Sequence, residues 1–414
     1  MSQFPPPQRA PRPWIWAILN LPFGVTYGYV AVTLGFLATQ QGLSEEVVAG
    51  LVAACLLPHT WKFLWAPVAD LTLTRKKWYL LGNLASAITI ATLGFLPLGS
   101  TLGLATAVIL VNSVFVSLLG MAVEGLMAHT TPPEDLGRAG GWFQAGNLGG
   151  GGIGGGLALL LAENASGELA SIATGVLIAA CCAGLLLVPT PHETREGTPL
   201  EAIKKVGHDL WSVFGSRLGL VAIALCLTPL GAGGASGLFS AIAKEWHASA
   251  DLVALIQGVL GGVVSAAGCL VGGLLSDRMN RRTAYVVAGL ILAAVAAGMA
   301  LAPQVEITYA IFCLAYSFAS GIAYGTFTGY VLEVIGKGAA ATKYNALASL
   351  ANIPILYMTL VLGHVAATQG EIAMLWVDAV AGVFGAVVIV GLATLLGVRK
   401  HHHVAVAEAA TPAP

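Results

Sequence analysis

The sequence has little charge for its length. Of its 414 residues, 19 are Lys or Arg and 20 are Asp or Glu, so charged residues make up 9% of the chain. In ordinary soluble domains that share is about a quarter. Hydrophobic residues make up 57%, and the mean hydropathy is +0.82. So few charges cannot cover a soluble surface, which excludes a soluble enzyme and a disordered chain. The net charge of −1 also excludes a nucleic-acid binder.

Cysteine is scarce as well. The six cysteines all lie inside apolar segments and form no C-x-x-C pair, which indicates buried apolar side chains rather than disulfides or metal ligands. The sequence also shows no nucleophile–base pair and no zinc-ligand spacing. We therefore predict no enzymatic activity, no metal and no other cofactor. The cysteines are Cys55, Cys181, Cys182, Cys226, Cys269 and Cys313.

The apolar residues occur in long continuous runs. Runs of about 20 residues predict membrane-spanning α-helices, whereas a transmembrane β-barrel would alternate apolar and polar residues in shorter segments. The sequence therefore predicts an all-α membrane protein with 12 transmembrane helices. The twelve segments are 14–41, 46–70, 78–98, 102–128, 138–162, 168–189, 218–243, 251–276, 283–302, 306–335, 341–367 and 372–397.

A single long polar stretch divides these segments six and six. It predicts a linker between two six-helix halves. The predicted parts are a tail at 1–13, an N-terminal half at 14–189, the linker at 190–217, a C-terminal half at 218–397 and a tail at 398–414.

The basic residues predict the orientation, because cytoplasmic loops of membrane proteins are rich in Lys and Arg. If the N-terminus is cytoplasmic, every basic residue except Lys62 and Lys244 falls in a cytoplasmic segment, which is 17 of 19 (19 − 2). We predict an inner-membrane protein whose termini and linker are all cytoplasmic.

The loops after the second and the eighth segment repeat one another. The first carries Asp70 and Arg75, and the second carries Asp277 and Arg282. The two aspartates are 207 residues apart (277 − 70), which is half of the chain, and the two arginines keep the same separation. Such a repeat predicts two related halves in parallel. Two related halves with a binding site between them are typical of a secondary transporter.

The second loop reads Gly-Leu-Leu-Ser-Asp-Arg-Met-Asn-Arg-Arg over 273–282 and resembles the signature loop of the major facilitator superfamily. The copy at 66–77 keeps the aspartate and the basic cluster but has Ala66 and Pro67 where the superfamily usually has Gly. In that superfamily these residues bond across helix ends and lock one face closed. The resemblance implies this gating role for Asp70, Arg75, Asp277, Arg278, Arg281 and Arg282.

Three further patches are similar to the AmpG-type muropeptide permeases and their relatives, the acetyl-coenzyme A transporters. They are 62–67 followed by Asp70, 122–138 and 341–350. The resemblance implies a muropeptide or a related amino sugar as cargo. Two departures leave other cargo open: Gly120 stands where this family would carry a second carboxylate, and the chain lacks the family's extra helices. A siderophore and an acyl-coenzyme A-like anion are the alternatives.

Two charged residues lie inside predicted membrane-spanning segments. A charge at the bilayer centre costs roughly 3 kcal/mol or more, so it needs a reason. Lys62 and Glu124 lie at similar depth, and an ion pair between them would lower that cost. One interpretation is a site for a substrate anion on Lys62 with Glu124 as proton carrier. The alternative is a structural gate pair, or a lysine that reaches for the cytoplasmic interface.

His59 and Glu333 are further candidates. His59 lies near the middle of its segment and shares a helix face with Lys62, and a histidine titrates near neutral pH, so it could couple proton movement to transport. A histidine packed on a neighbouring helix is the alternative. Glu333 lies 209 residues after Glu124 (333 − 124) and is expected to be a second gate contact, to Lys337 or Lys343. Asp378, in the last segment, is expected to be interfacial.

Uncharged polar side chains within the segments are expected to line a cavity, although each of them alone could equally bond a neighbouring helix. The candidates are Asn20, Tyr27, Asn112, Gln144, Asn147, Gln257, Tyr316, Tyr324, Asn352 and Tyr357.

The sequence therefore predicts a transporter that moves a polar small molecule by alternating access and uses protons. It predicts a monomer in contact with membrane lipid. The alternative from another class is a receptor of the same fold that binds its ligand without moving it.

Overall fold

The structure, a computed structural model, describes residues 10–190, 199–336 and 339–398. Within these residues every regular element is a helix. The predicted tails fall largely outside them, because residues 1–9 and 399–414 are not described. The chain is therefore all-α, as its long apolar runs predict.

The first elements of the chain form what we call the N-terminal group. Short 3₁₀ or π-helical segments, labelled η, continue several of its α-helices. The elements are α1 (Trp14–Gly28), η1 (Tyr29–Leu34), α2 (Gly35–Gln40), α3 (Glu45–Trp61), η2 (Lys62–Leu64), α4 (Ala66–Leu71), α5 (Arg75–Leu93), α6 (Leu98–Thr130), η3 (Pro133–Asp135), α7 (Leu136–Gly152), η4 (Ile153–Leu157), α8 (Ala158–Asn164), α9 (Gly167–Ala180) and η5 (Cys181–Leu187).

The helix α10 (Pro199–Phe214) follows, and the remaining elements form the C-terminal group. They are α11 (Arg217–Leu227), η6 (Gly234–Leu238), α12 (Phe239–Ile242), η7 (Ala243–Trp246), α13 (Ala250–Leu255), η8 (Ile256–Leu260), α14 (Gly261–Arg278), α15 (Arg281–Leu301), α16 (Glu306–Ile335), α17 (Ala340–Gln369) and α18 (Glu371–Leu395).

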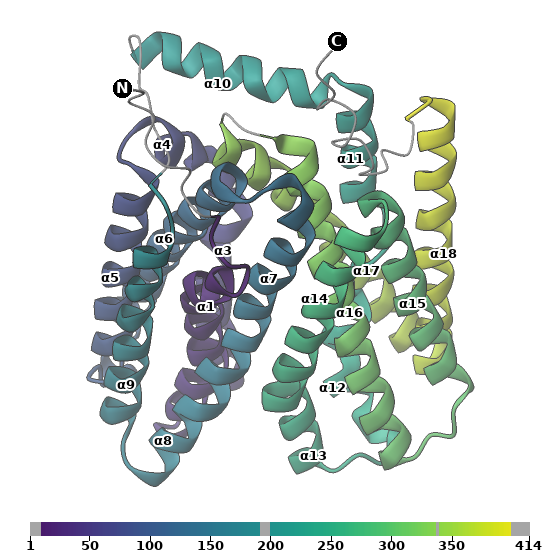
Figure 1. Cartoon of the computed structure of the whole chain (residues 1–414). Coiled ribbons are helices and arrows are strands. Elements are labelled where there is room, and N and C mark those ends of the chain that lie inside the picture. The colour runs from purple at the N-terminus through teal and green to yellow at the C-terminus, as the bar shows by residue number, and fades with distance from the viewer. Residues whose placement is uncertain (1–9, 191–198, 337–338, 399–414) are drawn as a thin grey trace, which may run out of the picture.

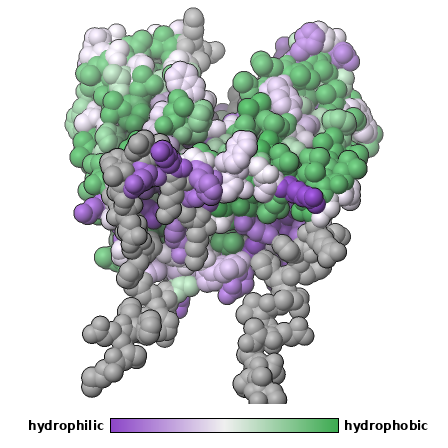
Figure 2. Space-filling model, turned by 90° about the horizontal axis from the view of Figure 1, so that it is seen from above, coloured by the Kyte–Doolittle hydropathy of each residue, from purple (hydrophilic) through white to green (hydrophobic). Residues whose placement is uncertain are grey.

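The two groups lie side by side, and α10 lies across one end of the molecule, which we call the α10 end (Figure 1). The helix turns by 81° into α11. Seen from the α10 end, hydrophobic residues dominate the two lobes, and hydrophilic residues gather toward the middle (Figure 2). Because α10 covers 199–214, the described part of the predicted linker is largely helical.

Nine helices among the described residues are long and apolar enough to cross a membrane, or ten if α10 and α11 count as one bent span. Three of the twelve predicted segments do not meet this criterion as single helices. The second breaks at η2, the third (α5) begins with three basic residues, and the seventh stops at Leu227, where α11 ends. The total of twelve spans stays a prediction.

Glycine decides how closely α1 and α7 pack. A Cβ atom on Gly24 would lie 1.8 Å from the Asn147 carbonyl oxygen, and one on Gly154 would lie 2.0 Å from the Val25 carbonyl oxygen. Only a glycine allows backbones this close. The glycine-rich run of α7 and η4 is thus a packing surface, and Thr33 adds a hydrogen bond to the Gly154 carbonyl at 3.1 Å.

The same helix, α7, also packs on α14 and α16 of the C-terminal group. A Cβ atom on Gly141 would lie 2.6 Å from the Cys269 carbonyl oxygen, and one on Gly140 would lie 2.8 Å from the Gly329 amide. One helix therefore presents glycines to both groups. This arrangement lets the two groups approach each other closely near the α10 end.

Candidate functional site

A cavity of about 350 Å³ lies between the two groups. Its walls come from α1, α3, α6 and α7 on one side and from α11, α15, α16 and α17 on the other. Nine of the sequence candidates line it: Asn20, Tyr27, His59, Lys62, Glu124, Gln144, Asn147, Tyr324 and Asn352.

Lys62 and Glu124 form the charged part of this cavity. The Lys62 Nζ lies 4.0 Å from the Glu124 Oε1, and the side chains are 11% and 4% exposed. The Asn345 amide of α17 donates to the Glu124 Oε2 at 2.5 Å. The carboxylate is therefore held by a cation of its own group and by an amide of the other group.

A local break in the helix positions Lys62. Pro58 lies inside α3 and removes one backbone hydrogen bond, and α3 ends three residues later at Trp61. The chain continues as the 3₁₀ turn η2, in which Lys62 is buried, before α4 begins. The Trp65 indole donates to the Ser117 hydroxyl of α6 at 2.9 Å, which ties this turn to the helix that carries Glu124.

His59 lies one turn before Lys62 in the chain. Its ring packs on Phe23 with 4.8 Å between the ring centroids. Its Nδ1 is buried and has no hydrogen-bond partner among the residues that the structure describes. Since a buried polar atom normally has a partner, this nitrogen is available to a ligand in the cavity.

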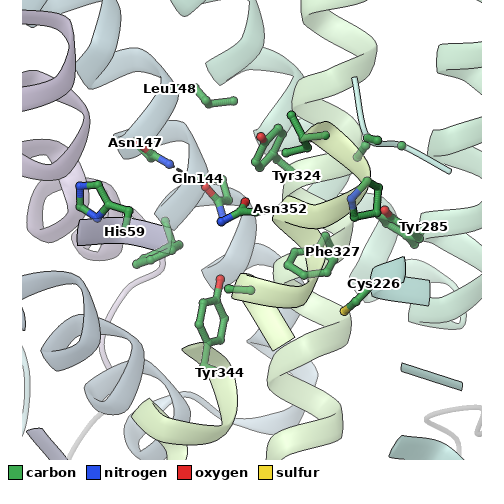
Figure 3. A pocket seen from close by; sticks show the side chains of 18 of the residues that line it. His59, Gln144, Asn147, Leu148, Cys226, Tyr285, Tyr324, Phe327, Tyr344 and Asn352 are labelled. Atoms are coloured by element: carbon green, nitrogen blue, oxygen red, sulfur yellow. Dashed lines mark hydrogen bonds between the residues drawn. The ribbon is translucent and has the colours of Figure 1, made fainter. Parts of the chain in front are cut away.

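Both walls combine polar side chains with aromatic or apolar ones (Figure 3). On the wall of the N-terminal group, Asn147 donates to Gln144 at 3.2 Å, near His59. The wall of the C-terminal group presents the rings of Tyr285, Tyr324 and Phe327. A solute that has both hydrogen-bonding groups and apolar surface matches this lining.

Two residues bridge the walls at Gln144. The Gln144 amide donates to the Thr328 hydroxyl at 2.8 Å, and Thr328 shares a hydrogen bond of 3.2 Å with the Tyr344 hydroxyl. Tyr344 and Asn345 are adjacent in α17, and the first lines the cavity while the second reaches Glu124. Neither residue is among the site residues predicted from the sequence, although both fall in the 341–350 patch.

Four predicted cavity residues lie elsewhere. Asn112 donates to Ser86 and Thr89 inside the N-terminal group, and Gln257 is an exposed residue of η8. Tyr316 is buried and donates to Asp378 at 2.8 Å, and Tyr357 donates to the Leu227 carbonyl at 3.0 Å. The direction in which each of these side chains points depends on the rotation of its helix about the helix axis. The positions of polar residues in the sequence do not give that rotation. Asn112, Gln257, Tyr316 and Tyr357 are therefore not among the described residues that line the central cavity.

Asp378 is likewise engaged inside the C-terminal group, through Tyr316, rather than at an interface. Glu333 also lies outside the central cavity, and its partner differs from the predicted one. The Arg281 Nη1 lies 3.0 Å from the Glu333 Oε2, while the Lys343 Nζ donates to the Ile335 carbonyl. Lys337 lies outside the described residues.

The two loop aspartates accept hydrogen bonds from helix starts of the opposite group. Asp70 accepts from the Thr342 amide at 2.8 Å and from its hydroxyl at 2.7 Å, at the beginning of α17. Asp277 accepts from the Gly137 amide at 2.7 Å and the Arg138 amide at 2.9 Å, at the beginning of α7. A carboxylate suits a helix N-terminus, so both contacts hold the groups together at the α10 end.

The basic residues of the two loops divide between different places. Arg75 lies 3.8 Å from Asp70, and Arg281 lies 3.8 Å from Asp277 and donates to the Pro133 carbonyl of the other group. Arg278 is exposed, and Arg282 lines a second, smaller pocket. The structure thus brings Asp70, Asp277 and Arg281 into contacts between the groups.

These features define a class of protein: a helical membrane protein with a cavity, lined by polar, charged and aromatic side chains, between two groups of helices. Residues 16–357 match the family model of the Major Facilitator Superfamily. That is most of the chain, and the chain belongs to this superfamily. It is accordingly a multi-pass membrane transporter and not an enzyme.

Known proteins agree with this assignment. The chain is 24% identical over 374 residues to the anhydromuropeptide permease of Escherichia coli K12, covering 87% of this chain and 75% of the permease. Among solved structures, the E. coli fucose:proton symporter has a TM-score of 0.69 at 15% identity, covering 92% of this chain and 99% of that one. The human organic anion transporter has a TM-score of 0.67 at 15% identity, covering 93% and 100%. The likeness to the solved structures shows the fold.

Proposed function

We propose that the protein is a proton-coupled transporter of a small amino-sugar solute derived from peptidoglycan. The observation that carries the proposal is the contact of Glu124 with both Lys62 and Asn345, because it joins a titratable carboxylate in the cavity to the opposite group of helices. A proton or a solute that changes the charge at Glu124 would change this bond, and with it the balance between two arrangements of the groups.

The cargo proposal rests on two facts. The muropeptide permease named above is similar over most of the chain. The cavity of about 350 Å³ lies at the lower end of the roughly 300–1,000 Å³ typical of ligand pockets. This volume favours an amino sugar or a short muropeptide fragment over a coenzyme A ester. The lining of amides and aromatic rings suits a sugar, whose ring has polar edges and apolar faces.

The architecture completes the proposal. We infer twelve spans in two six-helix halves (14–189 and 218–397), with 190–217 as linker, working as a monomer surrounded by lipid. The distribution of basic residues supports an inner-membrane protein with both termini and the α10 end in the cytoplasm. The polar contacts between the groups then close the cytoplasmic side in the described arrangement.

The direct test is uptake of a labelled anhydro-amino sugar into proteoliposomes under an imposed pH gradient. We expect uptake to collapse when an ionophore dissipates the gradient, and Glu124→Gln to lose the gradient-driven part. The matched control is Glu134→Gln, because Glu134 is exposed and outside the cavity. Uptake that ignores both the gradient and Glu124→Gln would refute proton coupling.

Lys62 is the observation that favours a second candidate, an anionic cargo such as a siderophore or an acyl-coenzyme A-like anion. A buried cation facing the cavity would attract a carboxylate or phosphate. Thermal-shift measurements with peptidoglycan fragments, siderophores and coenzyme A esters separate the cargo classes. Exchange of labelled solute across the vesicle membrane separates a transporter from a receptor, which would bind without exchange.

A further inference from the structure

A second pocket opens at the α10 end of the C-terminal group, away from the central cavity. Its volume is about 230 Å³. It lies among the beginnings of α11 and α15, the end of α16 and the residues after α18, a region at the upper right of Figure 1. Its lining residues are Arg217, Leu218, Asn280, Arg282, Tyr330, Glu333 and Val398.

Cations outnumber anions around this pocket. Arg217 and Arg282 line it, and Glu333, the one carboxylate among its described lining residues, is already paired with Arg281 at 3.0 Å. Arg217 is engaged only weakly, through a hydrogen bond of 3.4 Å to the Leu396 carbonyl. Arg282 forms no hydrogen bond or ion pair with any residue in the described part of the chain. A guanidinium carries five donors in a fork that matches an oxyanion, and these donors are available.

An unsatisfied hydroxyl points to a ligand independently of the charges. Tyr330 is 2% exposed and lines the pocket, and its hydroxyl is buried with no hydrogen-bond partner among the described residues. A buried hydroxyl without a partner loses its hydrogen bonds to water and gains nothing in return. Asn280 adds a second polar group, since its Oδ1 accepts from the Thr283 amide at 3.2 Å while its side-chain nitrogen remains to donate.

We propose that this pocket binds a phosphate-type oxyanion, with the guanidinium of Arg282 and the hydroxyl of Tyr330 as its main donors. Arg217 and the Asn280 amide complete the set of donors. Such an anion is carried by an anionic phospholipid headgroup and also exists as free phosphate, and the pocket's chemistry suits both. This inference does not depend on the cargo of the central cavity.

The pocket is linked to the closed end of the transporter. Glu333 lines it, and its partner Arg281 also lies 3.8 Å from Asp277 and donates to the Pro133 carbonyl of the N-terminal group. An anion beside Arg282 compensates the excess of positive charge next to this contact. Binding is therefore expected to stabilise the arrangement in which the α10 end is closed.

The test measures the thermal stability of the full-length purified transporter against two probes. One arm adds inorganic phosphate to detergent-solubilised protein. The other compares nanodiscs of phosphatidylcholine with nanodiscs that contain phosphatidylglycerol. Stabilisation by phosphatidylglycerol alone assigns the site to a lipid headgroup, and stabilisation by phosphate in detergent assigns it to a soluble anion.

Two variants locate the effect. Arg282→Gln removes a charge-assisted hydrogen bond and is expected to weaken binding by about tenfold or more. Tyr330→Phe is expected to leave the anion-free protein as stable as before or more so, because it removes an unpaired buried hydroxyl, and to reduce the anion-dependent gain. The matched control is Lys77→Gln, since Lys77 is an exposed basic residue that does not line the pocket.

The outcomes separate cleanly. A gain with either probe that Lys77→Gln keeps and that each folded pocket variant reduces supports the site. A gain that a folded pocket variant keeps in full, or no gain with either probe, overturns it. The phenylalanine variant keeps the test decisive even if the charge variant fails to fold.

Discussion

Glu124 and Glu333 occupy comparable places in the two groups, 209 residues apart (333 − 124), each near the α10 end of a long helix. Both pair with a cation of their own group, yet they serve different pockets. Glu124 is 4% exposed, lines the central cavity and pairs with Lys62, whereas Glu333 is 25% exposed, lines the smaller pocket and pairs with Arg281.

The partner cations explain the difference. At the offset of the loop repeat, Lys62 corresponds to Cys269 (62 + 207) and Arg281 corresponds to Thr74 (281 − 207), so neither cation has a basic counterpart. Lys62 precedes its loop and lies in the cavity wall, whereas Arg281 follows its loop and lies at the α10 end. The loops repeat, but these single differences in charge leave only the N-terminal group with the Lys62–Glu124 pair in the central cavity.

The largest expected effect comes from breaking the central pair. Lys62→Met leaves Glu124 buried without its cation and should lower the free energy of unfolding by roughly 3 kcal/mol and abolish transport. Adding Glu124→Gln should restore part of that stability, because no unpaired charge then remains. Denaturation of the wild type and of the three variants in detergent measures the coupling. A double variant no more stable than Lys62→Met would show that the two side chains do not interact.

Asp70 and Asp277 accept hydrogen bonds from helix starts of the opposite group, and substituting them tests whether both contacts hold the α10 end closed. Asp70→Asn and Asp277→Asn each weaken charge-assisted hydrogen bonds to the opposite group, worth about 2 kcal/mol. We expect either variant to favour opening at the α10 end. Spin labels on exposed Lys77 and exposed Arg278 should then move apart in double electron–electron resonance.

The control for both variants is Asp251→Asn, which changes an exposed carboxylate at the start of α13. It should leave the label distance unchanged. If only one of the two aspartate variants lengthens the distance, only that aspartate holds the α10 end closed. The two groups would then resemble each other in backbone but not in their gating contacts.

The smallest expected effect is that of Glu333→Gln. Glu333 is a quarter exposed, and the buried Arg281 keeps its contacts with Asp277 and the Pro133 carbonyl, so the loss of stability should stay near or below about 1 kcal/mol. Gradient-driven uptake should be retained, in contrast to Glu124→Gln. Loss of proton-driven uptake in Glu333→Gln would place a coupling carboxylate in the C-terminal group. Glu124 and Glu333 would then not differ in their role in transport.

Many residues of the site were predictable from the sequence, but their arrangement in space was not. The charges Lys62 and Glu124 stood out because charge inside an apolar run is costly. Asn112 and Tyr316 look the same in sequence as Asn147 and Tyr324, yet only the last two line the central cavity. Which face of a helix meets the cavity depends on packing with its neighbours. The contact of Asn345 with Glu124 joins residues 221 positions apart, and only the folded chain brings them together.

The sequence by itself determined the class of structure and the location of its charges. Long apolar runs leave a chain no stable form but helices in a membrane, and the half-length repeat of Asp70 and Asp277 predicts two related halves. Only the tertiary structure decided which polar groups meet. It depends on backbone approach that glycines such as Gly24 and Gly141 permit, on the helix break before Lys62, and on the rotation of each helix about its axis. These are properties of contacts between distant segments, so no local stretch of sequence contains them.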